Sequence, residues 1–136
     1  AHWPRGIQKS RRGIIDPTPA HLIDLFPTCL SVSGTSYPKM RKGKVLSPLQ
    51  GIDLSPLFTM GKSLPHRPLF FEHQGNKAVI MPPWKAVAKN GTSWELYPYP
   101  QDRTEQDDKA GEYRQEVRRL KELYLDWAKR NKVQNK

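Results

Sequence analysis

Cysteine is nearly absent from this chain of 136 residues, where Cys29 stands alone. A single thiol excludes an internal disulfide framework and a zinc site built from cysteine alone. Apolar runs are short as well, far below the ~18 residues that a membrane-spanning helix needs. The four histidines include no pair spaced as in local zinc sites. The opening Ala1-His2-Trp3-Pro4 lacks the apolar segment of a signal peptide, and we expect the chain to be a piece of a longer protein.

Acidic residues are also scarce relative to bases. The chain has 23 lysines and arginines against 13 aspartates and glutamates, a net charge of +10. Residues 1–50 hold eight of these bases and only two acids, Asp16 and Asp24. A field of this sign attracts polyanions such as nucleic acid, acidic lipid or sulfated sugar. Solubility and loosely ordered basic loops explain the same surplus without any ligand.

Proline and glycine, by contrast, are plentiful at 13 and 9 residues, and they favour strands, turns and coil over a helical bundle. Residues 1–20 predict extended coil. A short helix is expected next, with Asp24 as its cap, Pro27 in its first turn and Gly34 just after its end. The stripe that this helix is expected to bury consists of Leu25, Phe26, Cys29, Leu30 and Val32. Residues 35–67 predict a long loop, pinned to a surface by Leu54, Leu57 and Phe58.

The second half of the chain predicts a sheet and a covering helix. Four strand-like runs, 69–73, 77–81, 84–88 and 94–97, are separated by turn signals. Apolar residues then recur at helical spacing and predict one buried face of a helix of about 20 residues: Tyr113, Val117, Leu120, Tyr124 and Trp127. The expected fold class is α+β, a small four-stranded antiparallel sheet packed by a long C-terminal helix and preceded by a short helix and long loops.

The sequence predicts one domain over residues 1–136. It consists of a linker, short helix and loop (1–67), the antiparallel sheet (68–97), and a loop with the C-terminal helix (98–136). No phosphate-binding glycine loop, nucleophile elbow or nucleic-acid module is recognisable. The acidic stretch Asp102-Arg103-Thr104-Glu105 predicts a turn closed by its two carboxylates, much like a capping box, rather than a calcium loop. We therefore expect no catalytic residue and no metal ligand in this chain.

Several motifs occur in a characteristic order along the chain. The segment Phe71-Glu72-His73-Gln74-Gly75-Asn76-Lys77-Ala78-Val79 is similar to W-E-H-x-G-N-x-A-V, a motif in the C-terminal region of the arylsulfatase family, and the other motifs fall in that family's order. The further similar segments are Trp3-Pro4-Arg5-Gly6-Ile7, His21-Leu22-Ile23-Asp24, Gly51-Ile52-Asp53-Leu54-Ser55-Pro56-Leu57, Trp84-Lys85-Ala86-Val87, Trp94-Glu95-Leu96-Tyr97 and Asp102-Arg103-Thr104-Glu105. The resemblance covers nearly the whole chain.

This resemblance implies a sulfuric ester hydrolase of which the chain is the C-terminal portion. Such sulfatases use a formylglycine made from Cys or Ser in C/S-x-P-x-R, together with a calcium ion. The segment Ser63-Leu64-Pro65-His66-Arg67 matches by letter, but it runs straight into the F-E-H-x-G-N strand, so we treat the match as chance. Formylglycine and calcium are expected in an N-terminal catalytic domain that precedes these residues. The chain alone is expected to be inactive.

The resemblance also implies a partner and a substrate. The chain is expected to pack on the N-terminal catalytic domain and to shape a cleft for a sulfate ester, which includes sulfated glycans. The residues expected to touch this substrate are His73, Glu72 and Asn76. A secreted or periplasmic location follows from the resemblance alone. No membrane partner is expected, and nucleic acid is disfavoured as a partner. The alternatives are a stand-alone basic module that binds sulfated glycan or nucleic acid without catalysis, and a structural partner of another chain.

Overall fold

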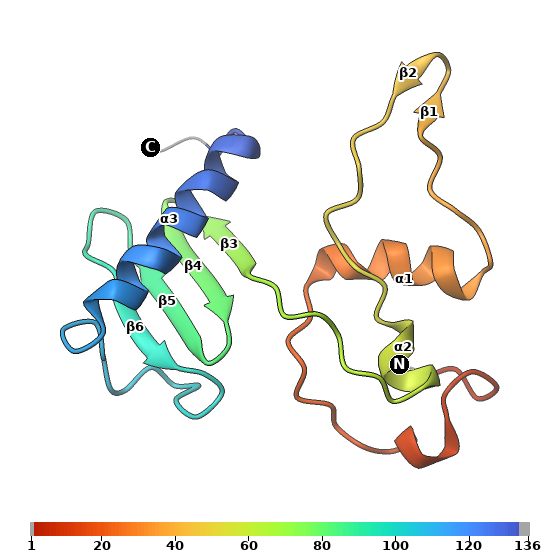
Figure 1. Ribbon diagram of the computed structural model, residues 1–136, viewed down its shortest axis with the longest axis horizontal. Coiled ribbons are helices and arrows are strands. Elements are labelled where there is room, and N and C mark those ends of the chain that lie inside the picture. The colour runs from red at the N-terminus through yellow and green to blue at the C-terminus, as the bar shows by residue number, and fades with distance from the viewer. Residues whose placement is uncertain (1, 134–136) are drawn as a thin grey trace. The chain divides into compact units, whose positions relative to one another are not determined.

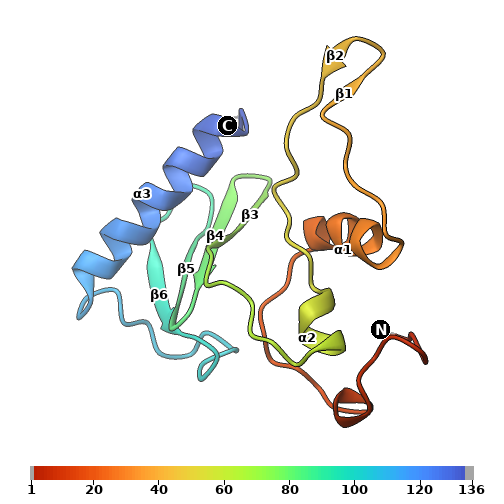
Figure 2. The same ribbon diagram turned by 45° about the vertical axis from the view of Figure 1, so that its right-hand side comes forward.

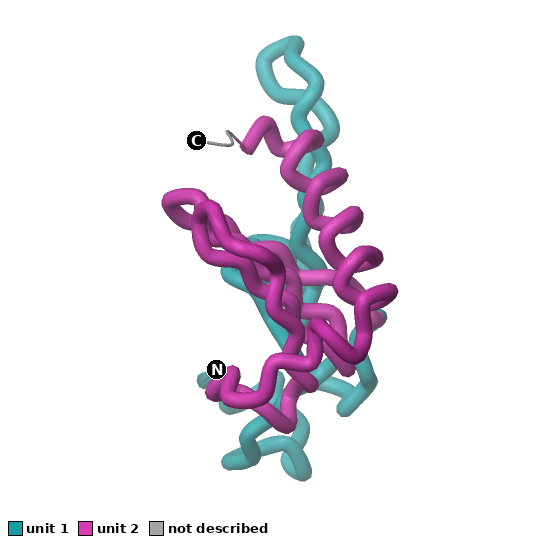
Figure 3. The backbone as a smooth tube through the Cα atoms, turned by 90° about the vertical axis from the view of Figure 1, so that its left-hand side faces the viewer, with its two compact units in different colours: residues 1–65 teal, residues 66–136 magenta. Residues whose placement is uncertain are grey.

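In the computed structural model, which describes residues 2–133, the chain forms two compact units, residues 1–65 and 66–136 (Figure 3). The division falls close to residue 67, where the sequence predicts the change from loop to sheet. The expected α+β fold is confirmed, with three α-helices and a four-stranded antiparallel sheet (Figure 1). That all 136 residues form a single domain stays a prediction.

Unit 1 is built from short elements joined by coil. In chain order they are the 3-10 helices η1 (Lys9–Arg11) and η2 (Leu22–Asp24), helix α1 (Leu25–Val32), strands β1 (Met40–Arg41) and β2 (Lys44–Val45), and helix α2 (Ser55–Thr59). Gly34 follows α1 with a positive φ of 70°, as expected of a residue that ends a helix. The predicted loop 35–67 is therefore wrong in part, because it contains a hairpin and a helix. Both are too short to leave a periodic signal in the sequence.

Most of the stripe that α1 was expected to bury is exposed within this unit, and only Leu30 is half-buried. Leu25 and Phe26 are 55% and 52% exposed, and Cys29, expected in the core, is exposed too. The prediction is wrong for a physical reason: in its own unit α1 packs mainly against η2 and the short α2, which are too small to cover an apolar face. Helical periodicity indicates which face is apolar, but not whether a neighbour is present to cover it.

Unit 1 is organised around the buried carboxylate of Asp24, which is 0% exposed. This carboxylate accepts hydrogen bonds from the backbone N–H of His21 at 2.8 Å and of Ile52 at 2.9 Å. The His21 ring accepts in turn from Ile23 N–H, which completes a capping box at η2 rather than the expected side-chain cap of α1. Gly51 permits this approach, since a Cβ there would lie 2.1 Å from the carbonyl oxygen of Ile23.

Further hydrogen bonds connect α1 to the segment that begins α2. The Thr28 hydroxyl donates to the Asp24 carbonyl at 2.6 Å and accepts from Leu54 N–H at 2.9 Å. The Asp53 carboxylate accepts from the backbone N–H and the hydroxyl of Ser55, each at 2.8 Å, which starts α2. Burial raises the pKa of Asp53, but hydrogen bonds from serine hydroxyls and the Ser55 backbone outweigh this effect, and the pKa is lowered overall.

Unit 2 contains the sheet and its covering helix. The strands are β3 (Leu69–His73), β4 (Asn76–Met81), β5 (Trp84–Ala88) and β6 (Glu95–Pro98), all antiparallel and in sequence order. Helix α3 (Arg114–Arg130) lies across one face of this sheet (Figures 1 and 2). All four predicted strands and the long helix are therefore confirmed. Strands β3 and β5 have the predicted bounds, β4 and β6 differ by one residue at one or both ends, and the helix has 17 residues instead of about 20.

The core of unit 2 lies between α3 and the sheet. One residue from each strand forms a cross-strand row beneath the helix: Phe70, Val79, Ala86 and Leu96. Leu120 and Tyr124 of α3 pack on this row and are fully buried. Trp127 stacks on Phe70 with 5.2 Å between ring centroids. Four of the five residues predicted for the buried helix face do pack here, whereas Tyr113 lies just before α3 and is 44% exposed against Trp84.

Substitution of the buried carboxylate tests the organisation of unit 1. We expect Asp24→Asn to raise the hydrogen-exchange rate of the Ile52 and His21 amides by roughly 10- to 100-fold, because a charged acceptor is worth about 1.5–3 kcal/mol per bond. The control is Asp126→Asn on the exposed side of α3. Unchanged exchange at Ile52 in Asp24→Asn would show that this carboxylate does not hold unit 1 together.

Candidate functional site

The three residues predicted to touch substrate lie at the tight turn between β3 and β4. Gln74 and Gly75 form this two-residue turn, both with positive φ (53° and 83°), and His73 pairs with Asn76 across it. Left-handed geometry at both turn positions matches the right-handed twist of a hairpin, which is why a glycine is needed there. The turn places all three predicted residues at one exposed end of the sheet.

The side chains of Glu72 and His73 lie on opposite faces of the sheet, because neighbouring residues of a strand alternate. Glu72 lies on the α3 face, near Tyr124 of that helix. Burial raises the pKa of the Tyr124 hydroxyl, and the negative charge of Glu72 adds to this effect. Its carboxylate accepts a hydrogen bond from Gly75 N–H at 2.9 Å and so closes the turn. Glu72 is therefore positioned first of all to stabilise the hairpin.

Asn76 connects the hairpin to the loop that follows β5. The side-chain NH₂ group of Asn76 donates to the backbone carbonyl of His73 at 3.0 Å. Its side-chain oxygen accepts from the backbone N–H of Asn90 at 3.3 Å. The Asn90 side chain also covers Gly75, where an added Cβ would lie 2.6 Å from it. Asn90 is a member of this site that the sequence alone does not identify, although the Asn90-Gly91 pair is a turn signal.

The imidazole of His73 differs from these two side chains. It is exposed, and it makes no hydrogen bond or ion pair with the residues that the structure describes. It points to the face away from α3, where Asn76 also belongs. Of the three predicted residues, His73 thus offers its polar atoms to an incoming group, whereas Glu72 and Asn76 hold its strand end in place.

The same face of the sheet carries acidic and phenolic groups beside β6. The Tyr97 hydroxyl donates to the Glu95 carboxylate at 2.9 Å, and burial together with this carboxylate raises the pKa of Tyr97. Lys85 forms an ion pair with Glu105.

The predicted turn at residue 102 is present: backbone N–H groups of residues 106 and 107 donate to Asp102 and lower its pKa. Glu105 does not close this turn, because its carboxylate reaches Lys85 instead.

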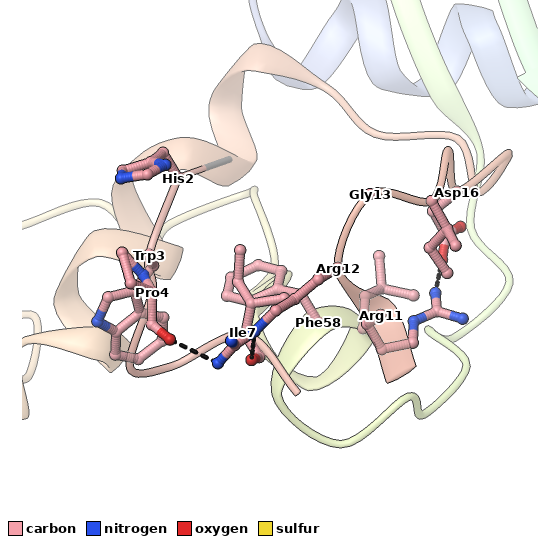
Figure 4. Close-up of a pocket in the computed structure, with 11 residues that line it drawn as sticks. His2, Trp3, Pro4, Ile7, Arg11, Arg12, Gly13, Asp16 and Phe58 are labelled. Atoms are coloured by element: carbon pink, nitrogen blue, oxygen red, sulfur yellow. Dashed lines mark hydrogen bonds and ion pairs between the residues drawn. The ribbon is translucent and has the colours of Figure 1, made fainter. Parts of the chain in front are cut away.

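A pocket of about 670 Å³ lies within unit 1 (Figure 4). Arg12 points into it, but its guanidinium donates to the backbone carbonyls of Ile7 and Pro4 at 3.1 and 2.6 Å. Arg11 pairs with Asp16, whose pKa is lowered by hydrogen bonds from Thr18 and by this arginine. Both guanidinium groups are thus bonded to the chain itself, which makes the pocket a poor site for an anion. No pattern in the sequence predicts this pocket.

A cluster of metal ligands and a membrane-spanning helix are both absent from the described residues. Within residues 2–133, no three His, Cys, Asp or Glu side chains are grouped so as to hold a metal ion. No helix in the described part of the chain combines the length and the apolar character needed to cross a membrane. The expected formylglycine and calcium of an N-terminal domain stay predictions.

Gly75 provides a direct test of the hairpin geometry. We expect Gly75→Ala to lower the free energy of unfolding by roughly 1–2 kcal/mol, because its φ is left-handed and the new Cβ would meet Asn90. Gly111→Ala is the matched control, since nothing lies within 4 Å of its Cβ position, and a change within about 0.5 kcal/mol is expected. Urea unfolding followed by tryptophan fluorescence measures both. Equal effects of the two substitutions would contradict the described turn.

Comparison with known proteins gives matches among solved structures. No protein-family model and no curated protein sequence matches the chain. The carrageenan sulfatase Ps i-CgsB superposes with a TM-score of 0.65 at 22% identity, over 81% of this chain and 24% of its own. BT4656, crystallised with its substrate D-glucosamine-2-N,6-O-disulfate, gives a TM-score of 0.57 at 20% identity, over 80% and 24%.

A third structure, yidJ from Bacteroides fragilis, which has been assigned as a sulfatase, gives a TM-score of 0.54 at 20% identity, over 78% of this chain and 24% of its own. The chain thus spans about a quarter of the length of these proteins. At this level of identity the likeness concerns the fold. About four fifths of this chain therefore shares its fold with about a quarter of each of these structures.

Proposed function

We propose that this chain is the C-terminal portion of an arylsulfatase, which packs on an N-terminal catalytic domain and forms part of the wall of its substrate cleft. The observation that carries the proposal is the fold match, in which four fifths of this chain superposes on about a quarter of each sulfatase. The ordered sequence motifs support the same assignment independently. The remaining three quarters of such a protein would supply formylglycine, calcium and the hydrolysis of the sulfate ester.

The exposed apolar face of α1 supports a partner of this kind. Leu22, Leu25 and Phe26 are 77%, 55% and 52% exposed, and they lie on or next to one short helix. Side chains of this type rarely gather on a free surface. A catalytic domain seated here would complete the stripe that the sequence predicted to be buried. A secreted or periplasmic location belongs to this proposal, since it follows from the sulfatase resemblance.

The proposed contact with substrate is made by His73. Its ring is exposed and its strand end is held by the bonds of Glu72 and Asn76. An imidazole N–H so placed donates to a sulfate or sugar oxygen, while the two neighbours keep the ring in position. Glu72 and Asn76 then act on the substrate mainly through His73. The stand-alone basic module is the second candidate, favoured by the excess of bases over acids in residues 1–50.

The intact mass of the native gene product tests the assignment. We expect a mass well above the 15.7 kDa of these residues. Peptide mapping should find a C-x-P-x-R or S-x-P-x-R segment that carries formylglycine, upstream of Ala1. A native product that begins at Ala1 would exclude the sulfatase assignment and favour the basic module.

In the complete enzyme, we expect His73→Ala to lower kcat/KM for the natural sulfate ester by roughly 10- to 100-fold, the loss of one hydrogen bond to a charged group. His66→Ala, an exposed histidine just before β3, is the control and should leave kcat/KM unchanged. If His73→Ala behaves like this control, the proposed contact is wrong.

A further inference from the structure

The hairpin formed by β1 and β2 carries a dense group of cations that no part of the proposed function uses. It extends away from α1 and α2 of its own unit (Figure 1). Six consecutive residues, 39–44, include Lys39, Arg41, Lys42 and Lys44, and all four are exposed. We refer to residues 39–46 as the basic hairpin.

The register of the basic hairpin sorts its side chains by face. Arg41 pairs with Lys44, Met40 pairs with Val45, and Leu46 N–H donates to the Lys39 carbonyl at 3.0 Å. Since side chains alternate along a strand, Lys39, Arg41 and Lys44 share one face. Met40 and Val45, 57% and 80% exposed, take the other. The hairpin therefore presents three cations on a single surface.

The turn of the basic hairpin keeps this surface in shape. Lys42 and Gly43 form a two-residue turn with φ of 48° and 75°. This left-handed pair is the geometry that matches the twist of two antiparallel strands. It also holds a fourth cation, Lys42, at the tip. The cations are thus fixed by a backbone ladder rather than scattered along coil.

No carboxylate of unit 1 is available to neutralise the basic hairpin. The unit has three acidic residues, and none lies in sequence between Asp24 and Asp53. Asp16 pairs with Arg11, Asp24 is fully buried, and Asp53 is bonded to Ser55. The field of the hairpin is therefore directed into solvent, where it attracts anions.

The spacing of the cations favours a polymer over a single anion. Residues two apart on a strand are about 7 Å apart along it, and paired residues across a hairpin are about 5 Å apart. Three cations at this spacing extend beyond one sulfate group, and they match anionic groups repeated along a chain. The basic hairpin contains no aromatic residue on which a nucleic-acid base could stack. This argues for a sulfated sugar polymer over single-stranded nucleic acid.

We propose that the basic hairpin binds a sulfated polysaccharide through Lys39, Arg41 and Lys44. The choice of sulfate as the anionic group rests on the proposed sulfatase function. Binding at such a surface would keep the enzyme on a polymer while individual sulfate esters are hydrolysed, and it would raise the local concentration of substrate.

The test compares two triple variants of the full 136-residue chain with equal change of charge. The first replaces the hairpin cations (Lys39→Gln, Arg41→Gln, Lys44→Gln). The control replaces three exposed cations of α3 (Arg118→Gln, Lys121→Gln, Lys129→Gln). The probes are dextran sulfate, uncharged dextran and double-stranded DNA, with affinity measured over a range of salt concentrations. Protection of the Ile52 amide against hydrogen exchange verifies that unit 1 is folded in both variants.

We expect the hairpin variant to bind dextran sulfate roughly 10- to 100-fold more weakly, as the loss of three surface cations predicts. Its salt dependence should become shallower by about two to three released counterions. The α3 variant should change little, and uncharged dextran should not bind. An equal loss in both variants would overturn the proposal in favour of diffuse attraction. So would tighter binding of DNA than of dextran sulfate at equal salt, or no binding of dextran sulfate.

These outcomes are distinct from those that test the sulfatase assignment. The binding assay needs no catalytic domain. If dextran sulfate does not bind, the hairpin proposal is wrong, but a formylglycine peptide upstream of Ala1 would still support the sulfatase assignment. Conversely, a native product that begins at Ala1 would exclude the sulfatase assignment even if dextran sulfate bound to the hairpin.

Discussion

The buried carboxylate of Asp24 is the interaction on which the first half of the molecule depends. It joins two segments that are far apart in sequence, since it accepts from His21 and from Ile52. A carboxyl group removed from water is stable only when its oxygens receive hydrogen bonds, so the segment around Gly51 must stay close for Asp24 to remain buried. Residues 35–50, which include the basic hairpin, are thereby closed into a loop anchored at its base, and this anchor fixes where the hairpin begins.

The sheet and the long helix were the parts of the fold that the sequence predicted well. Each strand has an apolar residue in the row under α3, and each turn carries its own signal, so local pattern and tertiary packing agree. The short elements of unit 1 were missed because two-residue strands and a five-residue helix leave no period to detect. The burial of α1 was predicted wrongly, because burial depends on a neighbour that periodicity does not reveal.

The candidate site shows the same division between what local sequence specifies and what it does not. The motif around Glu72-His73-Gln74-Gly75-Asn76 correctly located an exposed polar turn. It did not separate the roles of its members: Glu72 closes the turn by accepting from Gly75, and Asn76 bonds to Asn90 in another loop. Such roles depend on strand alternation and on a contact 14 residues away in the chain. Only the position of His73, exposed at the strand end, follows directly from the pattern.

The two units differ in what holds them together, and this difference has a calorimetric consequence. The buried apolar residues, such as Leu96 and Leu120, belong to unit 2, whereas the buried residues in the described part of unit 1 are Asp24 and Ser55. Heat capacity rises on unfolding when apolar surface is exposed and falls when polar surface is exposed. Unit 2 should therefore supply most of the heat-capacity increment of the chain. Unit 1 should unfold with only a small change in heat capacity, and its free energy of unfolding should depend less on temperature when the protein is cooled.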